Sequence, residues 1–252
     1  SFKNKNVSLL HGVTSSGKTE IYVKLINEFL KKDKQVLYLV PEIALTTQLI
    51  SRLKQYFGDT LAVYHSKYSP EQRTEIWKKV IKNDSRARVV IGARSSIFLP
   101  YNNLGLIIVD EEHENAYKQF NPAPRYHARD SAIFLSSLHK AKTLLGSATP
   151  SLESYYNAVT NKYGLVTLNK RYGNVSLPKI IINDLKESVS KKMMNGNFSH
   201  ILLNNIKKTF IKKEQVILFQ NRRGHSPYLE CSSCGFVYQC INCDVSLTYH
   251  QA

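Results

Sequence analysis

Residues 12–19 read GVTSSGKT and residues 106–113 read LIIVDEEH, and these two stretches decide the fold. The first fits the phosphate-binding pattern G-x-x-x-x-G-K-[ST], which requires a strand before it and a helix after it. Residues 7–10 supply a short apolar run, and residues 20–32 carry apolar side chains at helical spacing. The sequence therefore predicts a phosphate-binding loop between a strand and a helix.

The composition of this loop suits a nucleoside triphosphate. Gly12 and Gly17 allow sharp turns, so that backbone amides can point at phosphate oxygens. The start of the following helix adds a partial positive charge. We expect Lys18 to reach the outer phosphates and Thr19 to bind magnesium. The predicted ATP-binding residues form one continuous run: Gly12, Val13, Thr14, Ser15, Ser16, Gly17, Lys18, Thr19 and Glu20.

The second stretch predicts the carboxylates of the same site. Its apolar run, residues 106–109, is typical of a strand that is buried on both faces. Asp110 follows at the carboxyl end, where α/β sheets bind their ligands. We expect Asp110 to bind magnesium, directly or through water, and Glu111 to orient the attacking water. Lys18, Asp110 and Glu111 are thus the predicted catalytic residues.

Strand and helix patterns alternate along the first part of the chain, which predicts an α/β fold with a mainly parallel sheet. Strands are expected at residues 7–10, 35–40, 61–64, 88–92, 104–109, 142–146 and 164–168. Ser69, Pro70 and Gln72 predict the capped start of a helix. We expect Trp77 of that helix to pack in the core.

The later part of the chain is predicted with less regular structure. Residues 186–199 are polar and are expected to form a loop. A helix is expected at residues 200–213 and a strand at residues 215–219.

Charge and composition favour a polyanionic partner. The chain of 252 residues carries 35 Lys and Arg against 19 Asp and Glu, a formal net charge of +16. Residues 170–225 hold 12 of the basic and 3 of the acidic residues, which is +9 of that charge. A solvated basic surface is the alternative interpretation. We see no membrane-spanning stretch and no signal peptide, and we expect a cytoplasmic protein.

Further short stretches follow one another in a fixed order. They read VPEIALT at 40–46, VIGARSS at 90–96, GSATPS at 146–151 and ILFQNRRG at 217–224. Each places small, hydroxyl or basic residues at the end of a predicted strand, where they can approach a sugar–phosphate backbone closely. We expect Ser147 and Thr149 to relay the state of the γ-phosphate to the face that binds the nucleic-acid strand.

Together with HS at 65–66, RYHARD at 125–130 and the cysteine pairs, this set resembles superfamily 2 helicases. The sequences of these motifs are most similar to those of the bacterial primosomal replication-restart helicases. The resemblance implies a RecA-like lobe followed by the start of a second lobe and a cysteine-rich zinc segment. It also implies ATP-driven 3′-to-5′ unwinding of stalled or branched replication forks during primosome assembly.

The resemblance implies a division of labour along the chain. It places a first helicase lobe at residues 1–168, a connector at 169–178, the start of a second lobe at 179–224 and a partial zinc-binding region at 225–252. The implied cofactors are ATP, Mg²⁺ and Zn²⁺. The implied partners are forked and single-stranded DNA, other primosomal proteins and single-stranded DNA-binding protein, without a membrane.

Specific residues follow from matching the motifs. His113, Ser147 and Thr149 are the expected coupling residues. The expected DNA contacts are Arg94, Ser95, Tyr126, Arg222 and Arg223.

The segment after DEEH interleaves aromatic residues such as Tyr117, Phe120 and Tyr126 with basic ones. These aromatic side chains either stack on exposed bases and couple DNA contact to hydrolysis, or they pack on the lobe. The sequence favours neither interpretation.

The chain departs from the resemblance in two ways. Ser15 stands where the family usually has glycine, so a positive φ there would strain the backbone. The chain also stops after the second cysteine pair, before the family's later motifs. We therefore expect a piece that binds nucleotide, hydrolyses it slowly and does not unwind DNA alone.

All four cysteines form two C-x-x-C pairs, Cys231 with Cys234 and Cys240 with Cys243, which favour structural zinc over redox chemistry. Five residues separate the pairs, whereas a common Cys₄ spacing leaves roughly 15–20. The pairs therefore either share one zinc ion or are halves of two sites.

Two other functions stay open. Charge and a phosphate-binding loop do not distinguish a DNA helicase from an RNA helicase or another superfamily 2 translocase. The chain could also be a zinc-stabilised DNA-binding platform whose hydrolysis is dispensable.

Overall fold

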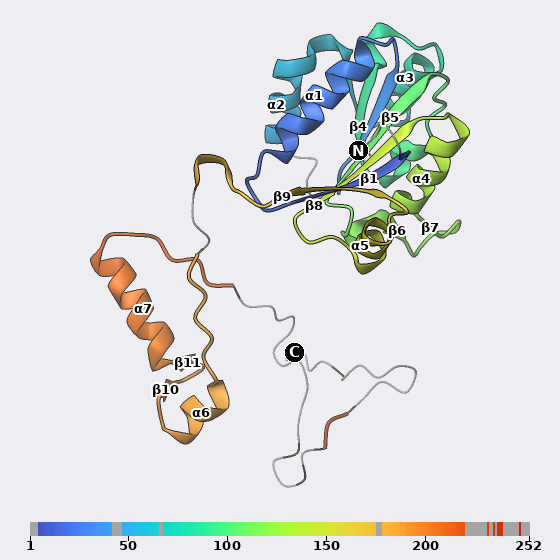
Figure 1. Cartoon of the computed structure of the whole chain (residues 1–252). Coiled ribbons are helices and arrows are strands. Elements are labelled where there is room, and N and C mark those ends of the chain that lie inside the picture. Colours follow the sequence, from blue (N-terminus) through green and yellow to red (C-terminus); the bar gives the residue numbers. More distant parts are fainter. Residues whose placement is uncertain are drawn as a thin grey trace. The chain divides into compact units, whose positions relative to one another are not determined.

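The computed structural model describes residues 5–41, 47–65, 68–174 and 178–219, together with residues 231, 234, 236–238 and 247 (Figure 1). The chain divides into two compact units, Ser1–Leu177 and Pro178–Ala252. Within these described ranges, no helix is long and apolar enough to cross a membrane.

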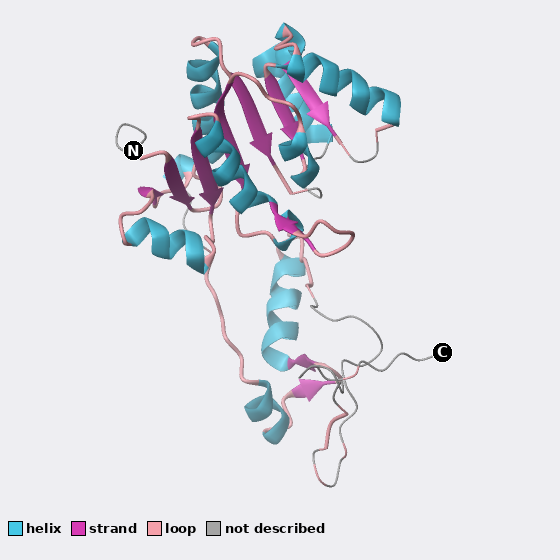
Figure 2. Ribbon diagram, turned by 90° about the vertical axis from the view of Figure 1, so that its right-hand side faces the viewer, coloured by secondary structure: helices cyan, strands magenta, loops and turns pink. Residues whose placement is uncertain are grey.

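The first unit is built on a seven-stranded sheet in which all neighbouring strands run parallel (Figure 2). Across the sheet the strands are β3 (Leu61–Tyr64), β4 (Val89–Gly92), β2 (Gln35–Leu39), β5 (Leu104–Asp110), β8 (Lys142–Ser147), β1 (Val7–Gly12) and β9 (Gly164–Leu168). All seven strands expected from the sequence are thereby confirmed, as is the mainly parallel α/β fold.

Five helices cover the two faces of this sheet (Figure 1). They are α1 (Lys18–Leu30), α2 (Thr47–Phe57), α3 (Pro70–Ile81), α4 (Ala128–Leu138) and α5 (Leu152–Val159). Residues of α1 and α2 share one hydrophobic cluster, and residues of α3, α4 and α5 share the other. Successive strand residues belong to opposite clusters, as Leu9 and Leu10 do, because side chains alternate across a strand.

Short elements connect the larger ones. They are η2 (Gly58–Thr60), η3 (Ser85–Ala87), η4 (Arg94–Phe98), η5 (Asn115–Tyr117), the two-stranded ribbon of β6 (Lys118–Gln119) and β7 (Tyr126–His127), and η6 (Tyr172–Asn174).

The central position of β5 sets the place of the site. Leu106 to Val109 are completely buried, because helices cover both faces of the sheet and strands β2 and β8 flank this strand. Only β8 separates β5 from β1, and Asp110 pairs in register with Gly146 of β8. The ends of β1 and β5 therefore open at the same edge of the sheet.

Helix α3 begins with the predicted cap, but one of its side chains does not pack where we expected. The Ser69 hydroxyl accepts a hydrogen bond from the amide of Gln72 (3.3 Å), and the Gln72 side chain accepts one from the amide of Ser69 (3.0 Å). The expectation that Trp77 packs in the core is wrong, since its side chain is 43 % exposed. Ile76 and Val80 take the buried face, so the helical rotation turns Trp77 towards solvent.

The second unit corrects two expectations. Residues 186–199, predicted as a loop, contain most of α6 (Leu185–Ser190) and the ribbon of β10 (Met194–Asn195) and β11 (Phe198–Ser199). The Asp184 carboxylate caps α6, because it accepts hydrogen bonds from two first-turn amides, and Gly196 takes a positive φ of 57° between the two strands.

Helix α7 (His200–Ile211) confirms the predicted helix, but residues 215–219 form no strand. Ile217 and Phe219 are 94 % and 87 % exposed. A strand needs a partner for its backbone groups, and these five residues have none among the described part of the chain.

Candidate nucleotide and nucleic-acid site

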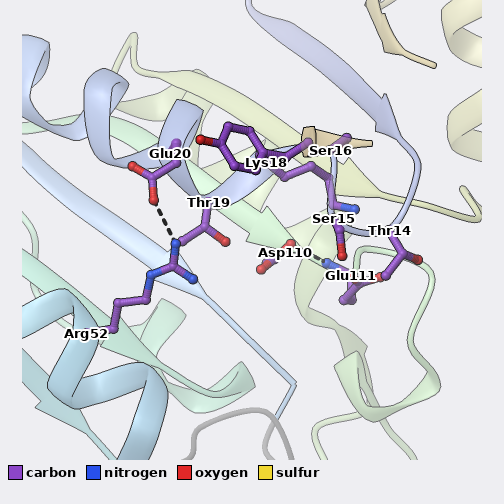
Figure 3. A pocket seen from close by; sticks show the side chains of 11 residues that line it. Thr14, Ser15, Ser16, Lys18, Thr19, Glu20, Arg52, Asp110 and Glu111 are labelled. Atoms are coloured by element: carbon purple, nitrogen blue, oxygen red, sulfur yellow. Dashed lines mark hydrogen bonds and ion pairs between the residues drawn. The ribbon is translucent and has the colours of Figure 1, made fainter. Parts of the chain in front are cut away.

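A cavity of about 630 Å³ opens where the phosphate-binding loop meets the end of β5 (Figure 3). The predicted loop residues and the predicted carboxylates line the same cavity. Its lining consists of Thr14, Ser15, Ser16, Gly17, Lys18, Thr19, Glu20, Arg52, Asp110, Glu111 and Tyr172. The structure therefore brings the loop at residues 14–20 together with Asp110 and Glu111, although about ninety residues of sequence separate them. Their individual roles stay predictions.

The loop has the geometry of an anion cradle. Gly17 has a φ of 87°, and the Lys18 ammonium donates a hydrogen bond to the carbonyl of Gly12 (2.9 Å). The Ser16 hydroxyl is buried and has no hydrogen-bond partner among the described residues. Lys18 to Glu20, the first residues of α1, line the same cavity, where helix N-terminal amides can face a phosphate. The residues present thus fit a bound triphosphate.

Ser15 has a φ of 62°, in the left-handed region. The strain expected if this position needed a positive φ is therefore present. A non-glycine residue in this region costs about 1 kcal/mol or more. The carbonyl of Ser15 also accepts a hydrogen bond from the amide of Tyr172 (2.9 Å), which places that exposed tyrosine at the cavity.

Asp110 is held by more groups than the sequence indicated. The hydroxyls of Tyr22 and Tyr38 donate to its two carboxylate oxygens at 2.9 and 3.1 Å, and the Glu111 amide donates to Oδ1 at 3.1 Å. Burial raises the pKa of the Asp110 carboxyl, an effect that these three donors and the charge of Lys18 oppose. The two tyrosines were not predicted, because their sequence pattern is that of core aromatic residues.

Glu111 and Glu20 sit on opposite sides of the lining. Burial, and then the neighbouring Asp110 charge, raise the pKa of the Glu111 carboxyl. The Glu20 carboxylate accepts hydrogen bonds from Arg52 (2.7 Å) and Tyr56 (3.2 Å) of helix α2. This pair is half-exposed, so it contributes little to stability but orients Glu20 at the cavity wall (Figure 3).

The three residues predicted to couple are in mutual contact. Ser147 Oγ lies 2.8 Å from His113 Nδ1, and Thr149 Oγ1 lies 3.3 Å from His113 Nε2. The amide of Thr149 also donates to Ser147 Oγ (2.9 Å). These contacts link the turn after β5 to the turn after β8.

A second network around Glu112 was missed by sequence reasoning. The Glu112 side chain is completely buried and accepts hydrogen bonds from the Ser151 amide (2.7 Å), the Ser154 hydroxyl (2.8 Å) and the Arg129 guanidinium (3.0 Å). Arg129 is itself buried and also donates to Asp130. The ion pair fastens the DEEH turn to the start of α4, and the hydrogen bonds from Ser151 and Ser154 fasten it to the start of α5. The sequence does not indicate this burial, because Glu112 stands among other acidic residues that are partly exposed or line the cavity.

The aromatic segment is partly buried and partly exposed, and its contact with bases stays a prediction. Tyr117 is completely buried and its hydroxyl donates to the Asp110 carbonyl (2.6 Å). Phe120, which directly follows β6, is 59 % exposed, with the Lys118 ammonium 4.8 Å from the centroid of its ring. The half-buried Tyr126 ring meets the ring of Phe98 edge-to-face at 4.9 Å. The segment therefore packs on the lobe through Tyr117 and exposes Phe120 to solvent.

The predicted nucleic-acid contacts divide between described and undescribed regions. Arg94 donates to the carbonyls of Ala116 (3.4 Å) and Lys118 (3.2 Å), so it ties η4 to the aromatic segment. Ser95 and Tyr126 are partly exposed beside it. Arg222 and Arg223 lie outside the described residues.

Of the two cysteine pairs predicted to bind metal, the first lies among the described residues. Cys231 and Cys234 are exposed, and the amide of Cys231 donates to the carbonyl of Phe236 (2.9 Å). Cys240 and Cys243 lie outside the described residues. Among the residues that are described, no group of three or more His, Cys, Asp or Glu side chains is placed to hold a metal ion.

Comparisons with known proteins agree with this geometry. Residues 2–158 match the model of the DEAD/DEAH box helicase family. Replication restart protein PriA of Bacillus subtilis is 46 % identical over 248 residues, which are 97 % of this chain and 30 % of that protein. PriA of Rickettsia felis is 46 % identical over 246 residues, 97 % of this chain and 37 % of that protein. The resemblance inferred from the motifs is confirmed.

The crystal structure of the DUF1998 helicase MrfA has a TM-score of 0.53, at 19 % identity, over 88 % of this chain and 34 % of that chain. This likeness shows a shared fold. The chain spans about a third of the length of the two PriA relatives.

The Glu112 network generates a stability prediction. Glu112→Gln should lower the free energy of unfolding by about 3–5 kcal/mol, because it removes the charge of the buried one of the two carboxylates that pair with Arg129. Urea-induced unfolding followed by circular dichroism measures the change. Glu153→Gln, on the exposed face of α5, is the matched control and should change stability by less than about 0.5 kcal/mol. Equal unfolding midpoints for both variants would show that the network does not stabilise the fold.

Proposed function

Because the chain belongs to the DEAD/DEAH box helicase family, we propose that its first unit binds ATP with magnesium as the motor lobe of a helicase. The observation that carries the proposal is that one cavity is lined by Lys18, Thr19, Asp110 and Glu111. A phosphate-binding loop alone binds many nucleotides. A loop that faces two carboxylates across one cavity is suited to hydrolysis.

Each side chain has a defined task in this proposal. Lys18 binds the outer phosphates, after exchanging its hydrogen bond with the carbonyl of Gly12. Thr19 and Asp110 hold magnesium, which when bound supplies positive charge against the phosphates. Glu111 accepts a hydrogen bond from the attacking water, and its half-buried carboxylate keeps that water positioned.

The His113 cluster would carry the nucleotide state outward. Ser147 and Thr149 contact both nitrogens of the His113 ring, and His113 Nδ1 lies 3.6 Å from the Glu111 carboxylate. A change at Glu111 would thus reach β8 through side chains in direct contact. This arrangement supports the proposed coupling between hydrolysis and the strand-binding face.

We propose further that the whole protein is a 3′-to-5′ DNA helicase that acts at stalled or branched forks in replication restart. The similarity to PriA over nearly the entire chain supports this role. The net charge of +16 favours a polyanionic partner. The partners in this proposal are forked and single-stranded DNA, other primosomal proteins and single-stranded DNA-binding protein.

Nucleotide binding tests the first step. Lys18→Ala should weaken the affinity for a fluorescent ATP analogue about 10- to 100-fold, because it removes a charge-assisted contact to the phosphates. The exposed Lys24→Ala of the same helix is the control and should bind like the wild type. Unchanged binding by Lys18→Ala would sink the proposed site.

The same variant separates a motor from a DNA-binding platform. A platform would keep its biological function when Lys18 is replaced, whereas a motor would lose it.

Tyr126 of the aromatic segment tests the nucleic-acid partner. Tyr126→Ala should weaken binding to a single-stranded DNA oligonucleotide about 5- to 100-fold, because stacking contributes about 1–3 kcal/mol per base. The affinity for ATP should stay unchanged. Tyr156→Ala, an exposed tyrosine of α5, is the matched control. Fluorescence anisotropy with DNA and RNA of equal sequence measures both partners, and tighter binding to RNA would favour the RNA helicase.

We propose that the two cysteine pairs hold structural zinc. Elemental analysis of the purified chain should find zinc, and replacing Cys231 and Cys234 with serine should remove it in part or whole. One zinc per chain with four sulfur ligands, measured by X-ray absorption, would assign a single shared site. Less than one, weakly held, would assign half-sites. A chain that takes up no zinc even when the ion is supplied would contradict the proposal.

A further inference from the structure

Two buried tyrosines converge on the carboxylate of Asp110. Tyr22 comes from α1 and Tyr38 from β2, and neither side chain is exposed. Their hydroxyls donate to Oδ1 and Oδ2 of Asp110 at 2.9 and 3.1 Å. The two rings meet edge-to-face, with their centroids 5.6 Å apart, so each ring packs against the other.

These hydrogen bonds leave little freedom to the carboxylate. An ionised carboxylate has about four acceptor positions. Tyr22 and the Glu111 amide share Oδ1, and Tyr38 takes one position on Oδ2. About one position remains, on Oδ2, for a water or a cation. The direction from which Asp110 can be approached is therefore fixed by the tyrosines.

Gly146 shows how closely the fold is built around this contact. It pairs in register with Asp110, and a Cβ atom at this position would lie 1.8 Å from the Tyr22 hydroxyl oxygen. Only glycine, which has no Cβ atom, leaves room at position 146 for the Tyr22 hydroxyl. The glycine that opens the GSATPS stretch is explained by this passage.

Tyr22 also connects the two halves of the cavity. It lies one helical turn after Lys18 and Thr19, so the helix that presents these two side chains also grips Asp110. A phenylalanine would fill the same volume without a buried hydroxyl, which costs free energy unless it is hydrogen-bonded. Packing alone therefore accounts for the rings but not for the two hydroxyls.

We propose that Tyr22 and Tyr38 are positioning residues that aim the Asp110 carboxylate at magnesium. The inference rests on the proposed nucleotide site and adds residues to it. It assigns Gly146 the role of admitting the Tyr22 hydroxyl.

Magnesium dependence of nucleotide binding tests the inference without relying on turnover. The affinity of the full chain for a fluorescent ATP analogue is measured across a range of Mg²⁺ concentrations and again in EDTA. Tyr22→Phe and Tyr38→Phe should each raise the half-saturating Mg²⁺ concentration about tenfold, the low end for losing an outer-shell contact to a metal ligand. Affinity in EDTA should be that of the wild type.

Tyr101→Phe is the matched control. Tyr101 is equally buried, and its hydroxyl donates to the carbonyl of Ser96 (3.1 Å), but it precedes β5 rather than reaching its carboxyl end. It should leave the Mg²⁺ dependence unchanged. An equal shift in Tyr101→Phe would show that loss of any buried hydroxyl produces the effect, which would overturn the inference.

Gly146→Ala provides a second route to the same contact. It keeps both hydroxyls but pushes that of Tyr22 away from Asp110, so it should shift the Mg²⁺ dependence like Tyr22→Phe. In the Tyr22→Phe background the nearest remaining ring atom lies 2.9 Å from the added Cβ rather than 1.8 Å, so the ring has less far to move, and no hydroxyl is left to displace from Asp110. There Gly146→Ala should add less than about twofold, the mark of two changes that act through one interaction.

Different outcomes would overturn the proposed function and the positioning role of the tyrosines. A wild-type chain that binds no nucleotide with Mg²⁺ would overturn the proposed function. A wild-type chain that binds, together with tyrosine variants that fold and keep its Mg²⁺ dependence, would overturn the positioning role alone. Thermal unfolding of each variant identifies those that fold.

Discussion

The site depends on a carboxylate placed at the end of a strand that is buried on both faces. Burial of a charge is costly unless the charge is paired and hydrogen-bonded. Asp110 therefore needs donors, and the structure supplies them from α1, from β2 and from its own following amide. Each donor belongs to an element whose position is already set by the sheet. The same core residues that pack the sheet therefore also hold the carboxylate of the cavity in place.

The four residues of the DEEH turn face different surroundings. Asp110 points at two tyrosines, Glu112 enters a buried network under α5, and His113 meets the turn after β8. Glu111 stays half-exposed at the cavity, and its positive φ of 47° turns the chain at that point. Four consecutive polar residues therefore connect the nucleotide cavity to three separate parts of the first unit.

The sequence predicted what local chemistry determines. Apolar runs located all seven strands, and the Ser69 cap located the start of α3. The phosphate-binding loop and Asp110 were found because their spacing has one strong physical interpretation. Partners far apart in the sequence were not found. Nothing local distinguishes Glu112, which is internal, from Glu111, which lines the cavity.

Errors in the prediction also have local causes. Residues 186–199 look like a loop by composition, yet a single aspartate cap and a glycine turn suffice to order them. Residues 215–219 have the composition of a strand, but composition does not supply a neighbouring strand to pair with.

The close approach of Tyr22 to Gly146 has a consequence for how related sequences can diverge. The two positions are sterically reciprocal, because the hydroxyl occupies the space that any larger residue at 146 would need. A lineage that enlarges residue 146 while it keeps the tyrosine displaces the hydroxyl from Asp110, whereas one that has already changed the tyrosine loses nothing by that step. Substitutions at these positions should therefore occur in a preferred historical order, and a large residue at 146 should mark relatives that hold their strand-end carboxylate by other means.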